Sequence, residues 1–445
     1  MKFFNEKAET MPLSELKALQ NHRIKETVER CYNTIPYYRE LFDKTGLKPK
    51  HIQNTEDLIH VPTTEKKDLR ALYPFPVLGF EPQEIFRFAA TTGTTGTPIT
   101  IGFTRKDWFE TLREQMGRLF AMWDIGVGDI VYQGYGLGLW MGGPSMELGT
   151  EAVRATLFPA GPGRSHAAVE WLRDLDMTVL LCSPSYALHL IRTAKMKGIN
   201  PSSDWKIKVT MFGGEKASTE IRRKIENELP EGAKTFTNYG LTETGGPAVA
   251  SECIYSREQE EMHIFADHLF PEIINPDTGE RLGPGEQGEL VLTTLTREAS
   301  PMIRWRTRDI MSWSKNPIGC KCGRDALPKI KGIVGRSDEM IKVRGTMFWP
   351  SQVEDILSSV EGVNIEGWQI YIETSDAELE KAKVAVEAAR DVWGQKGGAE
   401  KLKSRIASEL SSRLGQRIDV EIKSPDSLPR YERKATRIIR TKGED

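Results

Sequence analysis

A run rich in threonine and glycine, Thr91 to Pro98, separates two stretches of strand-like residues. Glycines let a backbone approach a phosphate closely, and hydroxyls and free N–H groups can donate to an anion without fixed charge. The run therefore predicts a phosphate-binding loop, and a plain hairpin turn is the alternative. The Lys-Ser/Thr ending of a P-loop is absent, which argues against an ordinary P-loop NTPase. The predicted loop residues are Thr91, Thr92, Gly93, Thr94, Thr95 and Gly96.

Three cysteines and a histidine form a second candidate site, consisting of Cys253, His263, Cys320 and Cys322. Three thiolates and one imidazole can bind Zn²⁺ tetrahedrally, and such a site is structural because no coordination position stays open. Unligated cytosolic thiols are the alternative, and His268 is a spare ligand in case His263 points away. The pattern predicts a structural Zn²⁺ that attaches the Cys320 loop to the larger domain.

Further segments resemble the adenylate-forming enzymes, whose phosphate loop has the same threonine-glycine form. Residues 212–215 resemble their turn beneath adenine, and residues 238–245 resemble their signature segment. In that signature the hydroxyl of Thr242 reaches phosphate and Glu243 holds Mg²⁺, an ion that prefers hard oxygen ligands. The resemblance implies that both act in catalysis. The ATP or AMP contacts that it implies here are Gly214, Glu215, Asn238, Tyr239, Gly240 and Thr242.

Two later segments resemble the ribose-binding and hinge segments of the same superfamily. Residues 304–310 (RWRTRDI) resemble the ribose clamp, in which Asp309 accepts hydrogen bonds from the ribose hydroxyls. Residues 335–338 resemble the hinge between a large and a small domain, with Asp338 as the pivot and Arg336 as another nucleotide contact. The segments occur in the superfamily's order, and together they predict one ATP site.

Within the superfamily, the chain most resembles the phenylacetate-CoA ligases. The segments that carry this resemblance are residues 36–39 (PYYR), 62–70 (PTTEKKDLR), 348–354 (FWPSQVE) and 428–435 (LPRYERKA). The last segment places the catalytic lysine at Lys434. An ammonium group there would stabilise the negative charge that develops when a carboxylate attacks the α-phosphate. A solvated surface lysine among arginines is the alternative reading of Lys434.

The same resemblance implies an acyl pocket made by Tyr135, Trp140, Met141, Gly214 and Pro247. An apolar, aromatic lining suits a flat acid such as an arylacetate or a benzoate. Ordinary core packing of Trp140 and Met141 is the alternative. The bulky indole could also shorten the pocket for a small branched or hydroxylated acid.

The elements that must position these residues follow an alternating pattern. Short apolar runs at 129–132, 178–182, 208–212 and 234–238 are separated by helical stretches such as 108–122 and 217–228. This alternation predicts an α/β fold with a parallel βαβ sheet. A helix is expected over residues 13–38, with Pro36 closing its pattern, and a small β unit near residues 283–294.

A second domain is expected after the hinge. The prediction is a large adenylate-binding domain over residues 1–336 and a smaller, mobile α+β lid over residues 337–445 that carries Lys434. The elements expected in the lid are strands at 340–343, 368–373 and 417–422 and helices at 351–360, 377–392 and 398–414.

Composition sets limits on the partners. The 445 residues include 61 basic and 63 acidic side chains, so the net charge of −2 predicts neither nucleic-acid nor membrane binding. No window approaches the roughly 18 apolar residues of a membrane helix. Five dispersed cysteines favour a reducing, cytoplasmic location. The sequence leaves a homodimer open.

The resemblance implies an ATP-dependent acyl-CoA synthetase that forms acyl-CoA, AMP and pyrophosphate through an acyl-adenylate. Its substrates would be ATP with Mg²⁺, coenzyme A and a carboxylate, by preference an arylacetate or another aromatic acid. The lid would rotate about Asp338 between the two half-reactions. The alternatives are a ligase for a small branched or hydroxylated acid and an adenylyltransferase that does not use coenzyme A. A zinc-dependent binding module would leave the threonine-glycine run unexplained.

Overall fold

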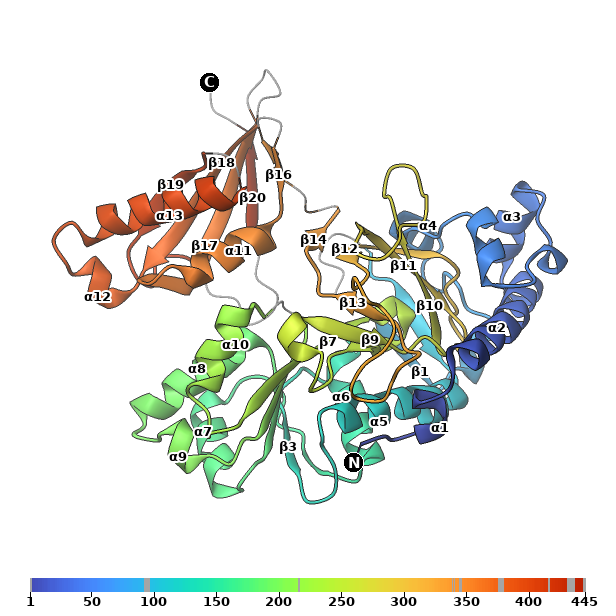
Figure 1. Cartoon of the computed structure of the whole chain (residues 1–445), viewed down its shortest axis with the longest axis horizontal. Coiled ribbons are helices and arrows are strands. Elements are labelled where there is room, and N and C mark those ends of the chain that lie inside the picture. Colours follow the sequence, from blue (N-terminus) through green and yellow to red (C-terminus); the bar gives the residue numbers. More distant parts are fainter. Residues whose placement is uncertain are drawn as a thin grey trace. The chain divides into compact units, whose positions relative to one another are not determined.

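The computed structural model describes residues 2–91, 97–214, 217–337, 339, 341–343, 346–374, 380–414, 417–429 and 437–442 (Figure 1). It divides into two compact units, one made of residues 1–213 and 225–332 and the other of residues 214–224 and 333–445. The helix α10 (Thr219–Glu226) crosses this division. The predicted lid role of residues 337–445 stays a prediction.

The first unit is built on an eight-stranded sheet with the order β13-β9-β8-β7-β6-β5-β3-β4. Neighbouring strands from β4 to β7 run parallel, and those from β7 to β13 pair antiparallel. All residues of β5 and β6 are buried, as expected for parallel strands covered on both faces. The predicted α/β fold is confirmed. The strands are β3 (Ile130–Gln133), β4 (Thr156–Phe158), β5 (Val179–Cys182), β6 (Val209–Phe212), β7 (Lys234–Leu241), β8 (Gly246–Ser251), β9 (Glu261–Ile264) and β13 (Lys329–Lys331).

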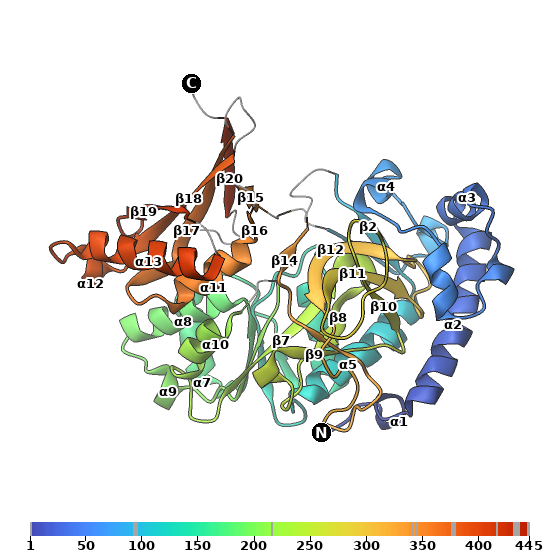
Figure 2. The ribbon, with the colours of Figure 1, turned by 45° about the horizontal axis from the view of Figure 1, so that its top comes forward.

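Helices connect the parallel strands, and α5 and α6 pack against each other and against β8 (Figure 2). The predicted helix at 108–122 is a short π-helical segment, η4 (Asp107–Leu112), followed by α5 (Arg113–Met122). The other helices are α6 (Gly142–Ala152), α7 (Ser165–Asp174), α8 (Pro184–Met196) and α9 (Pro201–Asp204). In the described residues, no helix has the length and apolar character needed to cross a bilayer.

Two smaller β structures accompany this sheet in the first unit. The strands β10 (Leu269–Ile274), β11 (Gln287–Thr294) and β12 (Trp305–Ser312) pair antiparallel, which confirms the small β unit predicted near residues 283–294. The hairpin of β1 (Arg87–Ala90) and β2 (Thr100–Phe103) flanks the threonine-glycine run. The described residues stop at Thr91 and resume at Thr97.

The long helix near the start, α2 (Leu13–Thr34), buries the apolar stripe that predicted it, and Pro36 begins the next helix, α3 (Pro36–Lys44). Polar side chains of α2 donate to backbone carbonyls of residues 266, 267, 295 and 297. These bonds satisfy buried carbonyls that lie outside the strand ladders. The short helices are α1 (Glu6–Glu9), α4 (Lys66–Ala71), η1 (Pro49–His51), η2 (Thr55–His60), η3 (Pro82–Glu84), η5 (Thr242–Thr244) and η6 (Arg257–Gln259).

The second unit has its own core around a four-stranded sheet with the order β19-β18-β17-β20. Trp368, Ile370, Val384 and Ile406 belong to this core. The strands are β14 (Gly335–Arg336), β15 (Ile341–Val343), β16 (Thr346–Phe348), β17 (Val363–Thr374), β18 (Glu380–Ala388), β19 (Asp419–Lys423) and β20 (Ile438–Lys442). The helices are α11 (Pro350–Ser359), α12 (Arg390–Trp393) and α13 (Gly398–Leu414).

The helix predicted over residues 377–392 is wrong in the described residues. Residues 380–388 form β18, which pairs antiparallel with β17 and parallel with β19. Ala382, Val384, Val386 and Ala388 belong to the hydrophobic core of this unit, and their spacing of two residues is the period of a strand. Pairing on both sides outweighs the helix propensity of the alanine, lysine and glutamate residues in this stretch.

Candidate nucleotide and metal sites

Two of the predicted nucleotide-binding residues meet directly. Tyr239 on β7 donates its hydroxyl hydrogen to Oδ2 of Asp309 on β12, with an O–O distance of 2.6 Å. Both residues are buried, at 5% and 3% exposed. A hydrogen bond to a carboxylate is short and strong, so it holds the carboxylate beside the phenol ring. The structure thus joins the signature segment to the segment that resembles a ribose clamp.

Asn238 precedes this tyrosine and has an unfilled acceptor. Its Nδ2 donates to the Pro247 carbonyl at 2.7 Å, whereas its Oδ1 has no hydrogen-bond partner among the described residues. A Cβ atom added at Gly213 would lie 3.1 Å from that oxygen. A buried acceptor without a donor is costly. Asn238 Oδ1 therefore suits the N–H group of a ligand bound near Gly213.

The rest of the signature segment is held closely. A Cβ atom at Gly240 would lie 2.2 Å from the Pro247 Cα, so only glycine fits at this crossing. Thr242 and Glu243 are buried in η5, and Gly245 after them has a φ of +106°. That angle lies in the region that favours glycine. The roles assigned to Thr242 and Glu243 stay predictions.

The threonine-glycine run is closed at its base by Thr91. The Ile99 N–H donates to Thr91 Oγ1 at 3.0 Å, and the Thr91 N–H donates to the Ile99 carbonyl at 3.0 Å. Gly214 and Arg336 belong to the second unit, where Arg336 Nε lies 3.8 Å from Glu339 Oε1. The other predicted site residues lie outside the described residues, namely Thr92, Gly93, Thr94, Thr95, Gly96, Glu215, Asp338 and Lys434.

Tyr135 joins the carboxyl ends of three parallel strands. Its hydroxyl donates to the Cys182 carbonyl at 2.6 Å and accepts from the Gly213 N–H at 2.8 Å. Its ring meets Trp140 edge-on, with the ring centroids 5.6 Å apart. The sequence predicted Tyr135 as an aromatic pocket wall. The link from its hydroxyl to the turn after β6 is additional, and no sequence period signals it.

Trp140 and Met141 stand beside the start of α6. The indole lies against Gly142, where an added Cβ atom would be 2.1 Å from ring atoms. Met141 is 1% exposed, and its Cβ lies 3.4 Å from the position of a Cβ added at Gly246, directly before Pro247. Tyr135, Trp140 and Met141 therefore lie close to the signature segment. Gly214, the other predicted pocket residue, belongs to the second unit.

Arg304, directly before β12, and Arg306 and Arg308 within it form ion pairs inside the first unit. The sequence did not predict these pairs. Each arginine pairs with a glutamate of the first unit, and Glu289 raises the pKa of Arg306 by accepting its hydrogen bond. The N–H of Thr64 donates to the Arg304 carbonyl at 2.9 Å, so the PTTEKKDLR segment pairs along this strand. The ion pairs are Arg304–Glu272 (3.2 Å), Arg306–Glu289 (2.6 Å) and Arg308–Glu65 (2.8 Å).

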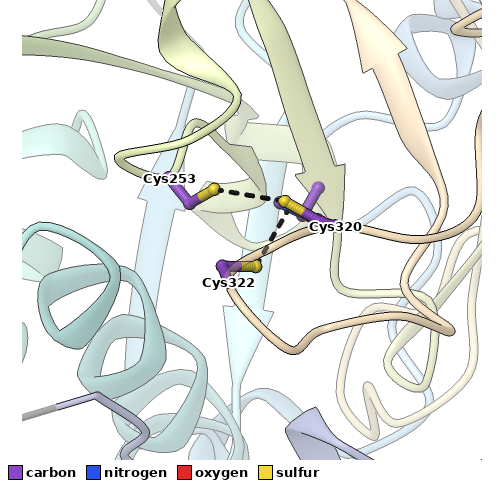
Figure 3. A group of neighbouring side chains, drawn as sticks. Cys253, Cys320 and Cys322 are labelled. Atoms are coloured by element: carbon purple, nitrogen blue, oxygen red, sulfur yellow. Dashed lines mark hydrogen bonds between the residues drawn. The ribbon is translucent and has the colours of Figure 1, made fainter.

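The four predicted zinc ligands converge. Their ligand atoms all lie within 4.8 Å of one another. Cys253 Sγ is 3.7 Å from Cys320 Sγ, and Cys322 Sγ is 3.5 Å from His263 Nε2. Zinc–thiolate bonds of about 2.3 Å in a tetrahedron place the ligand atoms roughly 3.7 Å apart. The cluster therefore fits Zn²⁺, and Figure 3 shows the three thiols turned toward one another.

The electrostatics of this cluster also suit a cation. Burial disfavours the charged form of His263, but the neighbouring Cys253 and Cys320 raise its pKa to about 9. Hydrogen bonds from Cys320 and Cys322 hold the pKa of Cys253 below its ordinary value. His263 Nδ1 lies 3.3 Å from the Leu327 carbonyl, and this contact leaves Nε2 toward the thiols. A divalent ion could replace the shared protons.

The spare ligand His268 belongs to a different buried network. Its Nε2 lies 3.0 Å from Glu114 Oε2 and its Nδ1 lies 3.0 Å from Thr296 Oγ1. In the same network Arg118 donates two hydrogen bonds of 2.9 Å to Asp267. Burial alone would raise the pKa of Asp267, but His268 and Arg118 outweigh it and lower the value to about 2.

Comparison with known protein families identifies the class of this chain. Residues 20–295 match the AMP-binding enzyme family, and residues 345–442 match the AMP-binding enzyme C-terminal domain. The chain belongs to the AMP-binding enzymes. Among its relatives is the phenylacetate-coenzyme A ligase of Thermus thermophilus, which is 33% identical over 95% of this chain and 96% of the relative. The Escherichia coli enzyme of that name is 32% identical over 97% and 96% of the two chains.

A solved structure agrees with these matches. The 2-hydroxyisobutyryl-CoA ligase in the postadenylation state, in complex with 2-HIB-AMP, superposes on this AMP-binding enzyme with a TM-score of 0.89. It is 27% identical, and the match covers 98% of this chain and 91% of that one. The predicted resemblance to the phenylacetate-CoA ligase family is confirmed.

Proposed function

We propose that this AMP-binding enzyme is a carboxylate–coenzyme A ligase that forms AMP and pyrophosphate through an acyl-adenylate. The geometry that supports it is the hydrogen bond of Tyr239 to Asp309, together with the preceding Asn238, whose Oδ1 has no hydrogen-bond partner among the described residues. A phenol ring, a carboxylate and an amide oxygen suit the base, ribose and exocyclic amine of an adenosine. Full-length relatives named as coenzyme A ligases support the reaction class.

The first half-reaction is a displacement at phosphorus. A carboxylate oxygen attacks the α-phosphorus of ATP, an acyl–O–P bond forms, and the bond to pyrophosphate breaks. Residues 91–96 and Thr242 would contact the phosphates, and Glu243 would hold Mg²⁺, which neutralises the phosphate charge. Lys434 would stabilise the negative charge on the α-phosphate oxygens in the transition state.

The second half-reaction is an acyl transfer. The sulfur of coenzyme A attacks the acyl carbon, the bond to AMP breaks, and the thiol proton is lost. We assign Asp338 as the pivot about which the small domain turns between the two steps, with Arg336 as a further nucleotide contact. Gly214 and Glu215 would line the turn beneath adenine.

For the acid we propose an arylacetate or another aromatic carboxylate. The edge-on pair of Tyr135 and Trp140, with buried Met141 close by, offers aromatic and thioether surface to a flat ring. Pro247 and Gly214 would complete the wall. A small branched or hydroxylated acid is the second candidate, favoured by the similarity to a 2-hydroxyisobutyryl-CoA ligase.

We further propose that Cys253, His263, Cys320 and Cys322 hold a structural Zn²⁺. When bound, the ion would cross-link the loop before β13 to the segment after β8 and to strand β9. It would supply no reaction chemistry, because four protein ligands leave no open position. The unbridged thiols of all five cysteines fit a cytoplasmic location. A homodimer stays open.

One assay tests the reaction. Pyrophosphate release is measured with ATP, Mg²⁺ and a panel of arylacetates, benzoates and short hydroxy acids, with and without coenzyme A, and the nucleotide product is identified. We expect AMP and pyrophosphate, and acyl-CoA only when coenzyme A is present. Formation of ADP and phosphate would refute the proposal. Turnover to AMP that does not depend on coenzyme A would favour the adenylyltransferase alternative.

A further inference from the structure

The loop that carries Cys320 and Cys322 is tied to residues 2–9. Arg324, two residues after Cys322, is 2% exposed, and its Nε donates to Glu9 Oε2 at 2.6 Å. Its Nη2 donates to the Lys2 carbonyl at 2.9 Å, and its guanidinium lies 4.9 Å from the centre of the Phe3 ring. These hydrogen bonds and this ring contact all join the loop to one distant segment.

Glu9 is built to receive this arginine. Its residue exposure is 1%, and its Oε1 accepts from the N–H groups of Phe4 and Asn5, each at 2.8 Å. Its other oxygen pairs with Arg324. A buried carboxylate is tolerated when it is paired and hydrogen-bonded, so removal of either partner would leave the other charge buried and alone.

The turn between the two cysteines is packed by the same segment. Gly323 has a φ of +92°, and a Cβ atom added there would lie 3.1 Å from Phe3 Cζ. The Gly323 N–H donates to the Cys320 carbonyl at 2.9 Å, which closes the turn. Phe3 thus covers the backbone that sets the spacing of the two thiols.

The segment is itself held on α5. Asn5 Nδ2 donates to Glu114 Oε1 at 2.7 Å. The Phe4 ring lies against Gly117, where an added Cβ atom would be 2.7 Å from three ring atoms. Residues 2–9 therefore connect the cysteine loop to α5, a helix that packs against β8 of the main sheet.

We propose that Glu9 and Arg324 are positioning residues of the metal cluster. Residues 2–9, held on α5, fix the turn at 320–324 so that Cys320 and Cys322 face Cys253 and His263. Metal binding and docking of residues 2–9 then stabilise each other. If the docked segment raises the affinity for the metal, thermodynamic linkage requires that the bound metal favours docking by the same factor. This inference rests on the proposed metal site and is independent of the ligase chemistry.

The test uses the full chain loaded with Zn²⁺. Zinc content is measured by elemental analysis, and zinc release is followed with the chromogenic chelator 4-(2-pyridylazo)resorcinol. Partners of metal ligands typically set affinity by 10- to 100-fold, so we expect release from Glu9→Gln to be about tenfold to a hundredfold faster than from wild type. Arg324→Lys, which keeps the charge but loses the forked donors, should give an intermediate rate.

The reverse direction has its own readout. Hydrogen exchange of residues 2–9 should speed up when the metal is stripped from the wild type and should change less in Glu9→Gln, where the segment is already loosened. Val28→Ala, in the buried stripe of α2, is the matched control. It should lower the melting temperature while leaving zinc release near the wild-type rate.

Three results would overturn the inference. Zinc release from Glu9→Gln at the wild-type rate would show that the ion pair does not support the cluster. Equal acceleration in Val28→Ala would show that general destabilisation explains the effect. A wild-type chain that takes up no Zn²⁺ would remove the metal site itself, while the pyrophosphate assay would still report separately on the ligase reaction.

Discussion

The Tyr239–Asp309 part of the nucleotide site and the metal cluster lie in the same unit but are built in opposite ways. At the nucleotide site, Asn238 Oδ1 has no hydrogen-bond partner among the described residues, and Tyr239 reaches across to Asp309. At the cluster, the four ligands are mostly buried, and the adjoining Arg324 is fully paired with residues 2–9. The first arrangement leaves a hydrogen-bond acceptor available for a ligand that binds and dissociates during turnover. The second arrangement can accept a single metal ion and no further ligand.

The largest effect should come from the charge delivered to the nucleotide. Lys434→Ala should slow adenylation a hundredfold to a thousandfold, about 3–4 kcal/mol, as for the loss of one preorganised transition-state donor. Thioester formation from supplied acyl-AMP should change far less. Lys401→Ala, which removes an exposed lysine from α13, is the control. Equal loss of both half-reactions would contradict the role given to Lys434.

A smaller effect should come from the ribose side of the site. Asp309→Asn removes a charged acceptor, which costs about 2 kcal/mol or roughly a thirtyfold rise in the KM for ATP. Tyr239→Phe keeps the carboxylate and should raise that KM only a few-fold. Steady-state kinetics at saturating acid separate the two variants. If both variants behave alike, the carboxylate acts only through the tyrosine.

The buried network of Arg118 and Asp267 is separate from both sites and tests whether buried ion pairs contribute to stability alone. The folded pKa of Asp267, about 2, lies below its ordinary 3.8, so its contribution is present above pH 3.8 and is lost as pH falls toward 2. The difference corresponds to about 2 kcal/mol. Asp267→Asn should therefore unfold at lower urea by a constant margin from pH 7 to pH 5, and the margin should narrow below about pH 4.

Its control is Asp174→Asn, which removes an exposed carboxylate whose pKa is lowered by a surface hydrogen bond to Arg173. Exposed pairs contribute little, so the urea midpoint should hardly move. A shift as large as that of Asp267→Asn would mean that net charge, and not the buried network, sets the stability. The KM for ATP should stay unchanged in both variants, since neither residue is part of the nucleotide site.

The smallest effect should concern the choice of acid. If Trp140 lines the proposed acyl pocket, Trp140→Ala enlarges that pocket, so kcat/KM should fall for short hydroxy acids and rise relatively for bulky arylacetates. The ratio should change about tenfold, near 1.4 kcal/mol. Trp393→Ala, at an exposed tryptophan, is the control. An unchanged ratio would place the indole outside the acyl pocket.

Local sequence patterns were sufficient to predict most of the fold and the family. Continuous apolar runs predicted the parallel strands, and the short segments with their order predicted the resemblance to the phenylacetate-CoA ligases among the adenylate-forming enzymes. Both predictions are confirmed. The stretch 380–388 was misjudged because alanine, lysine and glutamate favour helices, whereas its strand conformation depends on pairing with two neighbouring strands. The site roles of Lys434, Asp338 and residues 92–96 stay predictions.

Contacts between distant residues could not be predicted. The pairing of Glu9 with Arg324 spans 315 positions, and no period or motif connects them. The same holds for Glu65 with Arg308 and for the Tyr135 hydroxyl with Gly213. The sequence shows the members of these pairs as separate residues and does not show that they are in contact. The fold decides which of the many charged side chains becomes its partner.

Gly142 has a consequence for how selectivity could change. The Trp140 indole occupies the space that a methyl group at residue 142 would need. Any larger residue at position 142 must displace the indole, and so would reshape the proposed acyl pocket without altering any of its predicted lining residues. A library of variants intended to accept new carboxylic acids should therefore vary Gly142 first, since a small side chain there displaces the Trp140 indole.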